Sequence, residues 1–358
     1  MTYYAVCALM PQVLISLFGG VWADRYNRKY LIMISDGFIA LATTLIALAF
    51  LLGYQKLGLL LAASVIRSLG AGVQIPAVTA AFPQLVPREN LTRIQGINQT
   101  LGSISMLASP AVGGLVLNAV GILGAFCVDI VTAILAISIM AVIKLDKAPR
   151  STDQAPFWRE LKEGLAYTFG VRGLRLIIIC GVFAFLLITP AAFLSTLMVE
   201  RSFGGEIWRL TANEILWASG TILGGIFVAL KKQFHNKTKT IAISVVAHGI
   251  FFGLLGVSWN FTSYLIFMGL AGCFMPIMTT AQTVYMQEIS SPNLLGRVIS
   301  VWQFFTASAM PVAILFFGPL ADIIKIEYIM IASGILLALT GLIYGRGSSH
   351  ISGISDGV

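Results

Sequence analysis

Long apolar segments alternate with short polar breaks along almost the whole chain. Eleven of these segments are about as long as a helix must be to cross a bilayer, roughly 20 residues. They lie at 4–23, 30–53, 57–80, 93–118, 120–143, 171–197, 212–230, 240–258, 261–285, 297–321 and 324–344. Glycine and proline recur inside them, which membrane helices tolerate. The pattern predicts an all-α membrane protein with eleven transmembrane helices.

One polar stretch, residues 145–170, interrupts this rhythm and separates five spans in 1–144 from six in 171–345. Its second part, FWRELKEGLAYTF, places Trp158, Leu161, Leu165 and Phe169 at helical spacing among charged residues. We expect an amphipathic helix at the cytoplasmic membrane surface. The last segment, 346–358, is rich in glycine and serine, which is typical of a disordered tail.

Composition and charge agree with this architecture. Of 358 residues, 58% are hydrophobic and 11% are charged, whereas about a quarter of a soluble domain is charged. The net charge is +8. If the charged residues at 24–29 are cytoplasmic, then 18 of the 23 lysines and arginines lie on that side, four lie outside and one lies within a span. The positive-inside rule therefore predicts a cytoplasmic C-terminus and explains the charge without a nucleic-acid partner.

The residue types that usually carry enzyme or metal chemistry are sparse. The four cysteines lie in apolar segments without a CxxC pair, and the three histidines lack metal-ligand spacing. The chain has no phosphate-binding glycine loop, HExxH or GxSxG sequence. We therefore expect neither an enzyme nor a metal site.

A short charged motif lies between the first two spans. The sequence GVWADRYNRK contains a glycine, an aspartate and three basic residues at fixed spacing: Gly20, Asp24, Arg25, Arg28 and Lys29. It resembles the G-x-x-x-D-R-x-G-R-K signature that the major facilitator superfamily carries between helices 2 and 3. Asn27 replaces the usual glycine, and asparagine also tolerates left-handed backbone geometry. A carboxylate here can bind nearby arginines and the start of a neighbouring helix, which would make it a conformational latch.

A second motif lies in the fourth span, GINQTLGSISMLASPAVGG. It is similar to the antiporter signature in helix 5 of proton-driven exporters of the same superfamily. Four residues match that signature and two serines replace its glycines: Gly96, Pro110, Gly113 and Gly114, with Ser105 and Ser109. Small residues allow close helix approach and the proline bends the helix. In the family this face packs against helices of the other half and favours export over import.

Arg67 is the charged residue deepest in an apolar span, and such a charge costs several kcal/mol unless it is paired or faces water. It resembles the intramembrane arginine of the helix 4 motif in the superfamily, although Ala71 stands where a glycine is usual. Gln74, seven residues on, lies on the same face and is a cavity candidate. Asp129 is the best candidate for the partner and for carrying a proton, with Arg67 tuning its proton affinity. Asp36 lies nearer the cytoplasmic end, where it could belong to the latch instead.

Three further polar residues have two interpretations. In TANE, Thr211 and Glu214 form a capping box at a helix start, which we prefer to a coupling role for Glu214. Gln282 and Tyr285 could line a cavity, but exposed polarity near a helix end explains them equally well.

The likeness covers nearly the whole chain and is closest to the macrolide-efflux group of drug exporters, with siderophore exporters as near relatives. It implies two six-helix bundles that alternate between inward-facing and outward-facing states. The first helix of that fold has no counterpart here, so residue 1 would lie outside, and we expect a truncated gene, a wrong start codon or a fragment. The rivals are a siderophore or other metabolite exporter, an importer and a non-transporting fragment.

The resemblance implies proton-coupled efflux of a bulky, partly apolar, macrolide-like compound. The partners are then the small-molecule substrate, protons and the lipid bilayer, and no cofactor is needed. We expect a monomer in the cytoplasmic membrane of a bacterium.

Overall fold

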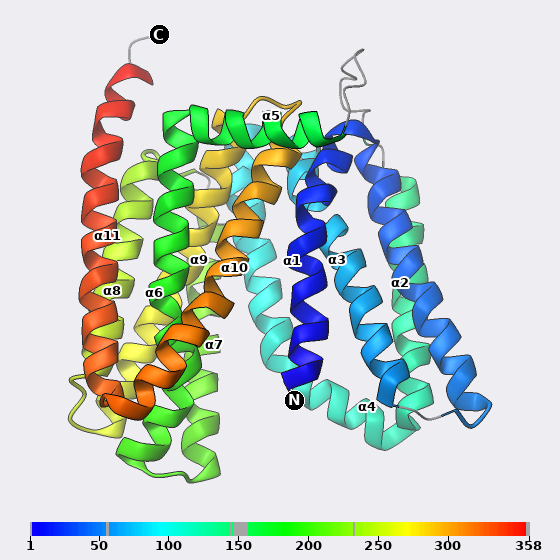
Figure 1. Ribbon diagram of the computed structural model, residues 1–358, viewed down its shortest axis with the longest axis horizontal. Coiled ribbons are helices and arrows are strands. Elements are labelled where there is room, and N and C mark those ends of the chain that lie inside the picture. The colour runs from blue at the N-terminus through cyan, green and yellow to red at the C-terminus, as the bar shows by residue number, and fades with distance from the viewer. Residues whose placement is uncertain (1, 55–56, 144, 146–156, 232, 356–358) are drawn as a thin grey trace. The chain divides into compact units, whose positions relative to one another are not determined.

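The computed structural model describes residues 2–54, 57–143, 145, 157–231 and 233–355, and within these ranges the regular structure is entirely helical. The helices are α1 (Thr2–Arg25), α2 (Arg28–Leu51), α3 (Leu57–Leu85), η1 (Arg88–Asn90), α4 (Leu91–Val142), α5 (Phe157–Gly170), α6 (Arg172–Phe203), α7 (Ile207–Leu230), α8 (Lys237–Leu255), α9 (Phe261–Ile289), α10 (Leu295–Ile323) and α11 (Ile326–Ser355) (Figure 1). Every predicted span is helical, which confirms the all-α prediction. Among the described residues, nine helices are long and apolar enough to cross a membrane.

The fourth and fifth predicted spans both belong to α4, and a break in the helical backbone separates them. Gly121 has φ 65° and ψ −174°, which no helix contains. Glycine populates positive φ at little cost, because it has no Cβ to clash with the backbone. The polar break predicted near residue 119 is therefore real, although it is a single-residue kink rather than a loop.

Two helix boundaries differ from those predicted. The structure starts α7 at Ile207, so Thr211 and Glu214 lie inside the helix and the predicted capping box is wrong. At the other end of the chain, α11 continues to Ser355, so residues 346–355 are helical where we predicted disorder. Tyr344 and Ser348 are buried, and packing of this kind outweighs the cost of about 1 kcal/mol for a glycine in a helix. Residues 356–358 lie outside the described residues.

The chain divides into two compact units that share two helices. Unit 1 comprises Met1–Pro87, Ser109–Phe169 and Ser290–Phe304, and unit 2 comprises Arg88–Ala108, Gly170–Ile289 and Phe305–Val358. Unit 2 therefore contains the first part of α4, and unit 1 contains the first part of α10. The charged motif at 20–29 contacts α10, and the antiporter-like motif at 96–114 lies on α4.

Helices within each unit approach closely at glycines. In unit 1, α1 packs on α3, where a Cβ on Gly19 would lie 2.7 Å from the carbonyl oxygen of Gly72. In unit 2, α8 packs on α11, where a Cβ on Gly249 would lie 2.4 Å from the amide nitrogen of Ala338. Close backbone approach at small residues is a common basis of helix packing in membranes. The predicted amphipathic helix is α5, which lies across the ends of α1 and α10 in unit 1 (Figure 1).

Candidate functional site

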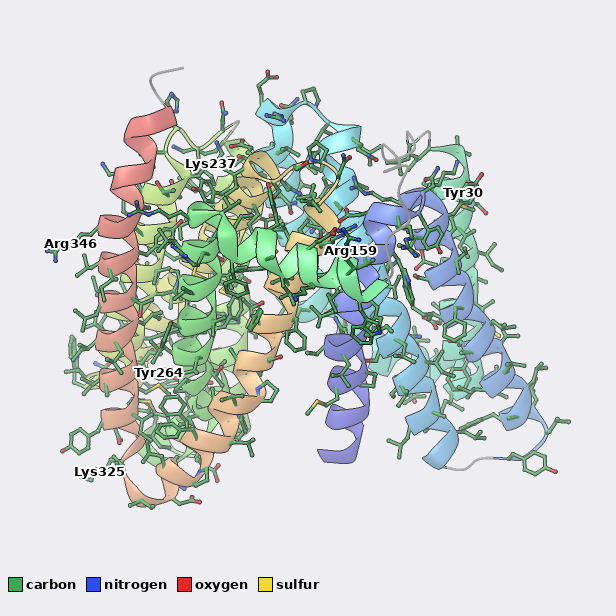
Figure 2. The ribbon with its side chains drawn as sticks, turned by 45° about the horizontal axis from the view of Figure 1, so that its top comes forward. Tyr30, Arg159, Lys237, Tyr264, Lys325 and Arg346 are labelled. Carbon is green, nitrogen blue, oxygen red and sulfur yellow. The ribbon has the colours of Figure 1, made fainter. Side chains whose placement is uncertain are left out.

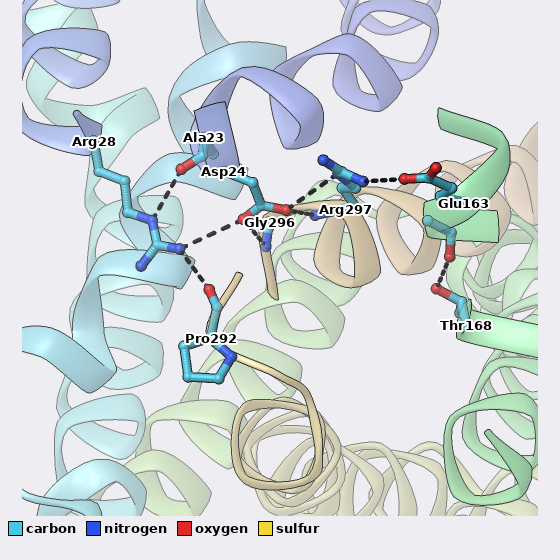
Figure 3. Close-up of polar contacts among 9 residues, drawn as sticks. Ala23, Asp24, Arg28, Glu163, Thr168, Pro292, Gly296 and Arg297 are labelled. Atoms are coloured by element: carbon cyan, nitrogen blue, oxygen red, sulfur yellow. Dashed lines mark hydrogen bonds and ion pairs between the residues drawn. The ribbon is translucent and has the colours of Figure 1, made fainter. Parts of the chain in front are cut away.

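The carboxylate of Asp24 binds the first turn of α10. Its Oδ1 accepts a hydrogen bond of 2.8 Å from the Gly296 amide, and its Oδ2 accepts one of 2.9 Å from the Arg297 amide (Figure 3). The first amides of a helix have no partner inside the helix, and they carry the positive end of its dipole. Asp24 is the last residue but one of α1, and only 8% of it is exposed. We call Asp24, Arg28, Gly296 and Arg297 the Asp24 cluster.

Two arginines flank this carboxylate. Arg28 is 3% exposed and lies 3.5 Å from Asp24 Oδ1. Its other donors bind backbone carbonyl oxygens of three segments: Ala23 at 3.1 Å, Ala80 at 2.7 Å and Pro292 at 3.3 Å. On the opposite side, Arg297 Nε lies 3.8 Å from Asp24 Oδ2. A buried arginine with this many acceptors fixes the geometry of the ends of α1, α3 and α10, which all lie in unit 1.

Burial sets the electrostatics of Asp24, which lies just beyond the predicted span 4–23. Removal from water raises the pKa of its carboxyl from the usual 3.8 to about 6, and the two amides and two arginines act in the opposite direction. The carboxyl therefore remains ionised at neutral pH.

The other motif residues have separate structural roles. Gly20 is packed against Ser300, and a Cβ here would meet the Ser300 hydroxyl oxygen at 2.2 Å. Lys29 Nζ donates to the carbonyl oxygens of Ala141 and Ile143 at the end of α4, where a cation suits the helix dipole. Arg25 is half-buried at the end of α1.

Asn27, which replaces the glycine of the motif, has extended backbone geometry. It does not adopt left-handed geometry, because its φ is −65° and its ψ is 117°. Its side chain accepts a hydrogen bond from the Lys29 amide and caps the start of α2. The asparagine therefore suits this position as a helix cap.

A second polar site lies between helices of unit 1. Arg67 on α3 forms an ion pair with Asp129 on α4, and Thr43 on α2 donates a hydrogen bond of 2.9 Å to the same carboxylate. The side chains are 51% and 33% exposed, respectively, for Arg67 and Asp129. Gln74 donates to Asp36, which places Asp36 beside this pair rather than in the Asp24 cluster.

The ion pair and the Gln74–Asp36 pair line one pocket, with a volume of about 540 Å³. Its polar lining comes from four helices and includes hydroxyls as well as both carboxylates: Gln12, Asp36, Ser64, Arg67, Ser68, Gln74, Asp129 and Thr132. We call it the Asp129 pocket. A charge pair half open to a polar pocket avoids the cost of facing lipid.

Within the described part of the chain, the antiporter-like segment of α4 is packed closely at only one of its glycines. A Cβ on Gly96 would lie 2.4 Å from the Ala229 amide nitrogen of α7, within unit 2. Among the described atoms, none lies within 4 Å of the positions that a Cβ would take on Gly113 or Gly114. Ser105 and Ser109 are exposed, and the backbone stays helical through Pro110.

The remaining candidates belong to unit 2. Gln282 on α9 is fully buried, so exposed polarity does not explain it, and neither of its side-chain polar atoms has a partner among the described residues. Tyr285 is half-buried and packs against Gly173 of α6. Glu214 lies beside Asn213 inside α7.

Sequence reasoning missed three residues that complete these sites: Thr43, Glu163 and Arg297. Glu163 of α5 lies 3.6 Å from Arg297 and extends the Asp24 cluster (Figure 3). Arg297 stood in a recognisable position, at the start of an apolar span, but its contact with Asp24 joins segments 273 residues apart. No local pattern reports such a contact.

Comparison with known proteins assigns the family. The family model of the Major Facilitator Superfamily matches residues 1–314, so the chain belongs to that superfamily. It is a multi-pass membrane transporter of small molecules and not an enzyme.

Individual relatives are similar over most of the chain. Macrolide efflux protein A of Streptococcus pyogenes is 28% identical over 328 residues, which are 90% of this chain and 81% of that protein. The enterobactin exporter EntS of Shigella boydii is 27% identical over 334 residues, 91% of this chain and 77% of that protein. The crystal structure of the Escherichia coli fucose:proton symporter has the same fold, with a TM-score of 0.76, 14% identity, and coverage of 96% and 90% of the two chains.

Proposed function

We propose that this transporter exports a bulky, partly apolar compound in exchange for protons. A macrolide-like cargo is supported by the likeness to macrolide efflux protein A, and a siderophore is the second candidate because of the likeness to an enterobactin exporter. The proton gradient would drive the cycle, so no cofactor is required. The protein would act as a monomer in the cytoplasmic membrane, with its C-terminus in the cytoplasm.

The ion pair in the Asp129 pocket is the observation that carries the proton step. Among the described residues, Asp129 has one charged partner, Arg67, and one hydroxyl partner, Thr43. When the helices move and the guanidinium withdraws, the carboxylate loses its counter-charge and takes up a proton. When the pair forms again, the proton leaves. The polar lining of the pocket supports water access to this exchange.

The Asp24 cluster would hold one of the two alternating conformations. Its hydrogen bonds join the end of α1 to the start of α10, and α10 is divided between the two compact units. Charge-assisted hydrogen bonds are about twice as strong as neutral ones, and they are lost together when the helix ends separate. Such a contact acts as a latch between conformations.

Uphill efflux from cells tests the proton step. A macrolide and enterobactin are the two cargoes, and each is measured with and without an uncoupler. We expect Asp129→Asn to abolish uphill efflux, so that cargo accumulates in the cells. Cargo binding should persist, because apolar contacts supply most of the binding free energy. Efflux that survives the uncoupler in the parent would contradict proton coupling, and parental uphill efflux by Asp129→Asn would assign Asp129 a structural role.

Thr132→Val is the matched control for this experiment. Thr132 lines the same pocket, but among the described residues its hydroxyl binds only backbone carbonyl oxygens of its own helix, those of Val128 and Asp129. We expect this variant to pump at close to the parental rate.

A further inference from the structure

Helix α5 contacts the start of α10 at three points, all of them in unit 1. The Tyr167 hydroxyl accepts a hydrogen bond of 3.1 Å from the Ser291 amide. Glu163 Oε2 lies 3.6 Å from Arg297 Nη1. Between these contacts, Gly164 lies against the Arg297 side chain, where a Cβ would come within 2.9 Å of the Arg297 Cβ.

The same contacts complete a line of alternating charges. Arg28, Asp24, Arg297, Glu163 and Arg159 follow one another at separations of 3.5, 3.8, 3.6 and 3.3 Å. The line begins at buried side chains and ends at the surface of α5, where Glu163 is 51% exposed and Arg159 is 72% exposed (Figure 2). Arg297 is its middle member and lies between two carboxylates (Figure 3).

We propose that α5 positions the first turn of α10 for Asp24, with Glu163 and Tyr167 as the positioning residues. The proposal rests on the latch role given to Asp24 above. Asp24 binds two consecutive amides, so the first turn of α10 must be held in one orientation. Tyr167 fixes the chain just before this turn, and Glu163 fixes the Arg297 side chain that shares Asp24. The linker helix therefore helps to close the latch and does more than connect the two halves.

A cysteine at position 300 reports whether the latch is closed. Ser300 is 1% exposed and faces Gly20, so a thiol there should react with a maleimide only when α1 and α10 separate. The experiment uses the full chain with the four native cysteines replaced by alanine and Ser300→Cys introduced. The variants are Glu163→Gln, Tyr167→Phe and Asp24→Asn, and gel filtration checks that each is folded.

The matched control is Lys162→Gln, on the exposed side of the same helix. We expect Glu163→Gln and Tyr167→Phe to raise the labelling rate about two- to fivefold, which is the range for half-exposed polar contacts. Asp24→Asn should raise it about tenfold or more, since charged hydrogen bonds are stronger. Lys162→Gln should leave the rate unchanged.

The double variant distinguishes positioning from general destabilisation. If Glu163 acts through Arg297 and Asp24, adding Glu163→Gln to Asp24→Asn should not raise the rate further. Independent, multiplicative effects would overturn the proposal, as would a Glu163→Gln rate equal to that of Lys162→Gln while Asp24→Asn still accelerates labelling. If Asp24→Asn itself has no effect, the latch role fails and the positioning role fails with it.

Discussion

At the scale of single residues, the two sites use charge in different environments. The charged side chains of the Asp24 cluster are buried and pair through Asp24, so removing this carboxylate leaves buried arginines without their counter-charge. Such a loss typically costs 3–5 kcal/mol. The Arg67–Asp129 pair is half exposed to a polar pocket, so its members can separate at lower cost. The first arrangement suits a contact that is either made or broken as a whole, and the second suits a group that exchanges protons.

We predict that Asp24→Asn reduces transport at least tenfold with nearly normal expression. The amide nitrogen of asparagine cannot accept a hydrogen bond, so one of the two amides of α10 loses its acceptor. A charge-assisted hydrogen bond is worth about 1.5–3 kcal/mol, which corresponds to a ten- to hundredfold effect. Efflux rate per amount of folded protein is the measurement. A loss of expression that matches the loss of efflux would indicate a folding role.

Arg67→Lys should impair transport although it keeps the charge. Arginine presents a planar fork of donors, whereas lysine is a point charge on a flexible stem. Lysine therefore cannot reproduce the contact with the Asp129 carboxylate in the same geometry. Uphill efflux of a macrolide should fall severalfold in this variant. Parental efflux would show that any positive charge suffices at position 67.

Whether a site residue could be predicted depended on whether it stands out within its own segment of the sequence. Asp24, Arg67 and Asp129 could be selected because charges near or inside apolar segments are conspicuous in the sequence. Glu163 could not be selected, because it looks like one of several solvent-facing charges on an amphipathic helix. Its relevance comes from Arg297, 134 residues further on. The sequence left the site of Asp36 open, because its partner, Gln74, lies on another helix.

At the scale of helices, glycine has two different effects in α4. Gly96 lies against the backbone of α7, whereas Gly113 has no atom within 4 Å of its Cβ position among the described residues. The hydropathy pattern predicted the ends of α4 to within about two residues and placed the break at residue 119, two residues before Gly121. It could not show which glycines pack against another helix, because small residues have the same spacing along the sequence whether their face is packed or open.

We predict opposite effects for alanine at these two glycines. Gly96→Ala should lower thermal stability in detergent, because the new methyl group meets the Ala229 amide nitrogen at 2.4 Å and overpacking costs about 1–3 kcal/mol. Gly113→Ala should leave stability unchanged or raise it, since alanine favours a helix by up to about 1 kcal/mol over glycine. Equal melting temperatures for the two variants would contradict close packing at Gly96.

At the scale of the whole molecule, the chain is a major facilitator transporter, and its charges predict its orientation in the membrane. The all-α membrane architecture could be predicted because the bilayer imposes length and hydropathy on every spanning helix. Eleven spans were predicted, whereas nine helices among the described residues are long and apolar enough to cross a membrane. Figure 2 shows Lys237 and Arg346 towards one end of the helices of unit 2 and Lys325 at the other. The helical continuation of α11 past residue 345 could not be predicted, because packing at Tyr344 and Ser348 leaves no trace in a Gly/Ser-rich sequence.

The orientation itself can be measured by labelling single cysteines in intact cells. His235→Cys lies in the α7–α8 connection, next to a concentration of lysines, and Gly205→Cys lies in the α6–α7 connection; both positions are exposed. Because basic loops stay in the cytoplasm, a membrane-impermeant maleimide should label position 205 from outside and should reach position 235 only after the membrane is opened. The native cysteines are replaced in both variants, and the parent chain without cysteines is the control, which should not be labelled. Labelling of position 235 in intact cells would reverse the orientation and, with it, the assignment of the Asp24 cluster to the cytoplasmic side.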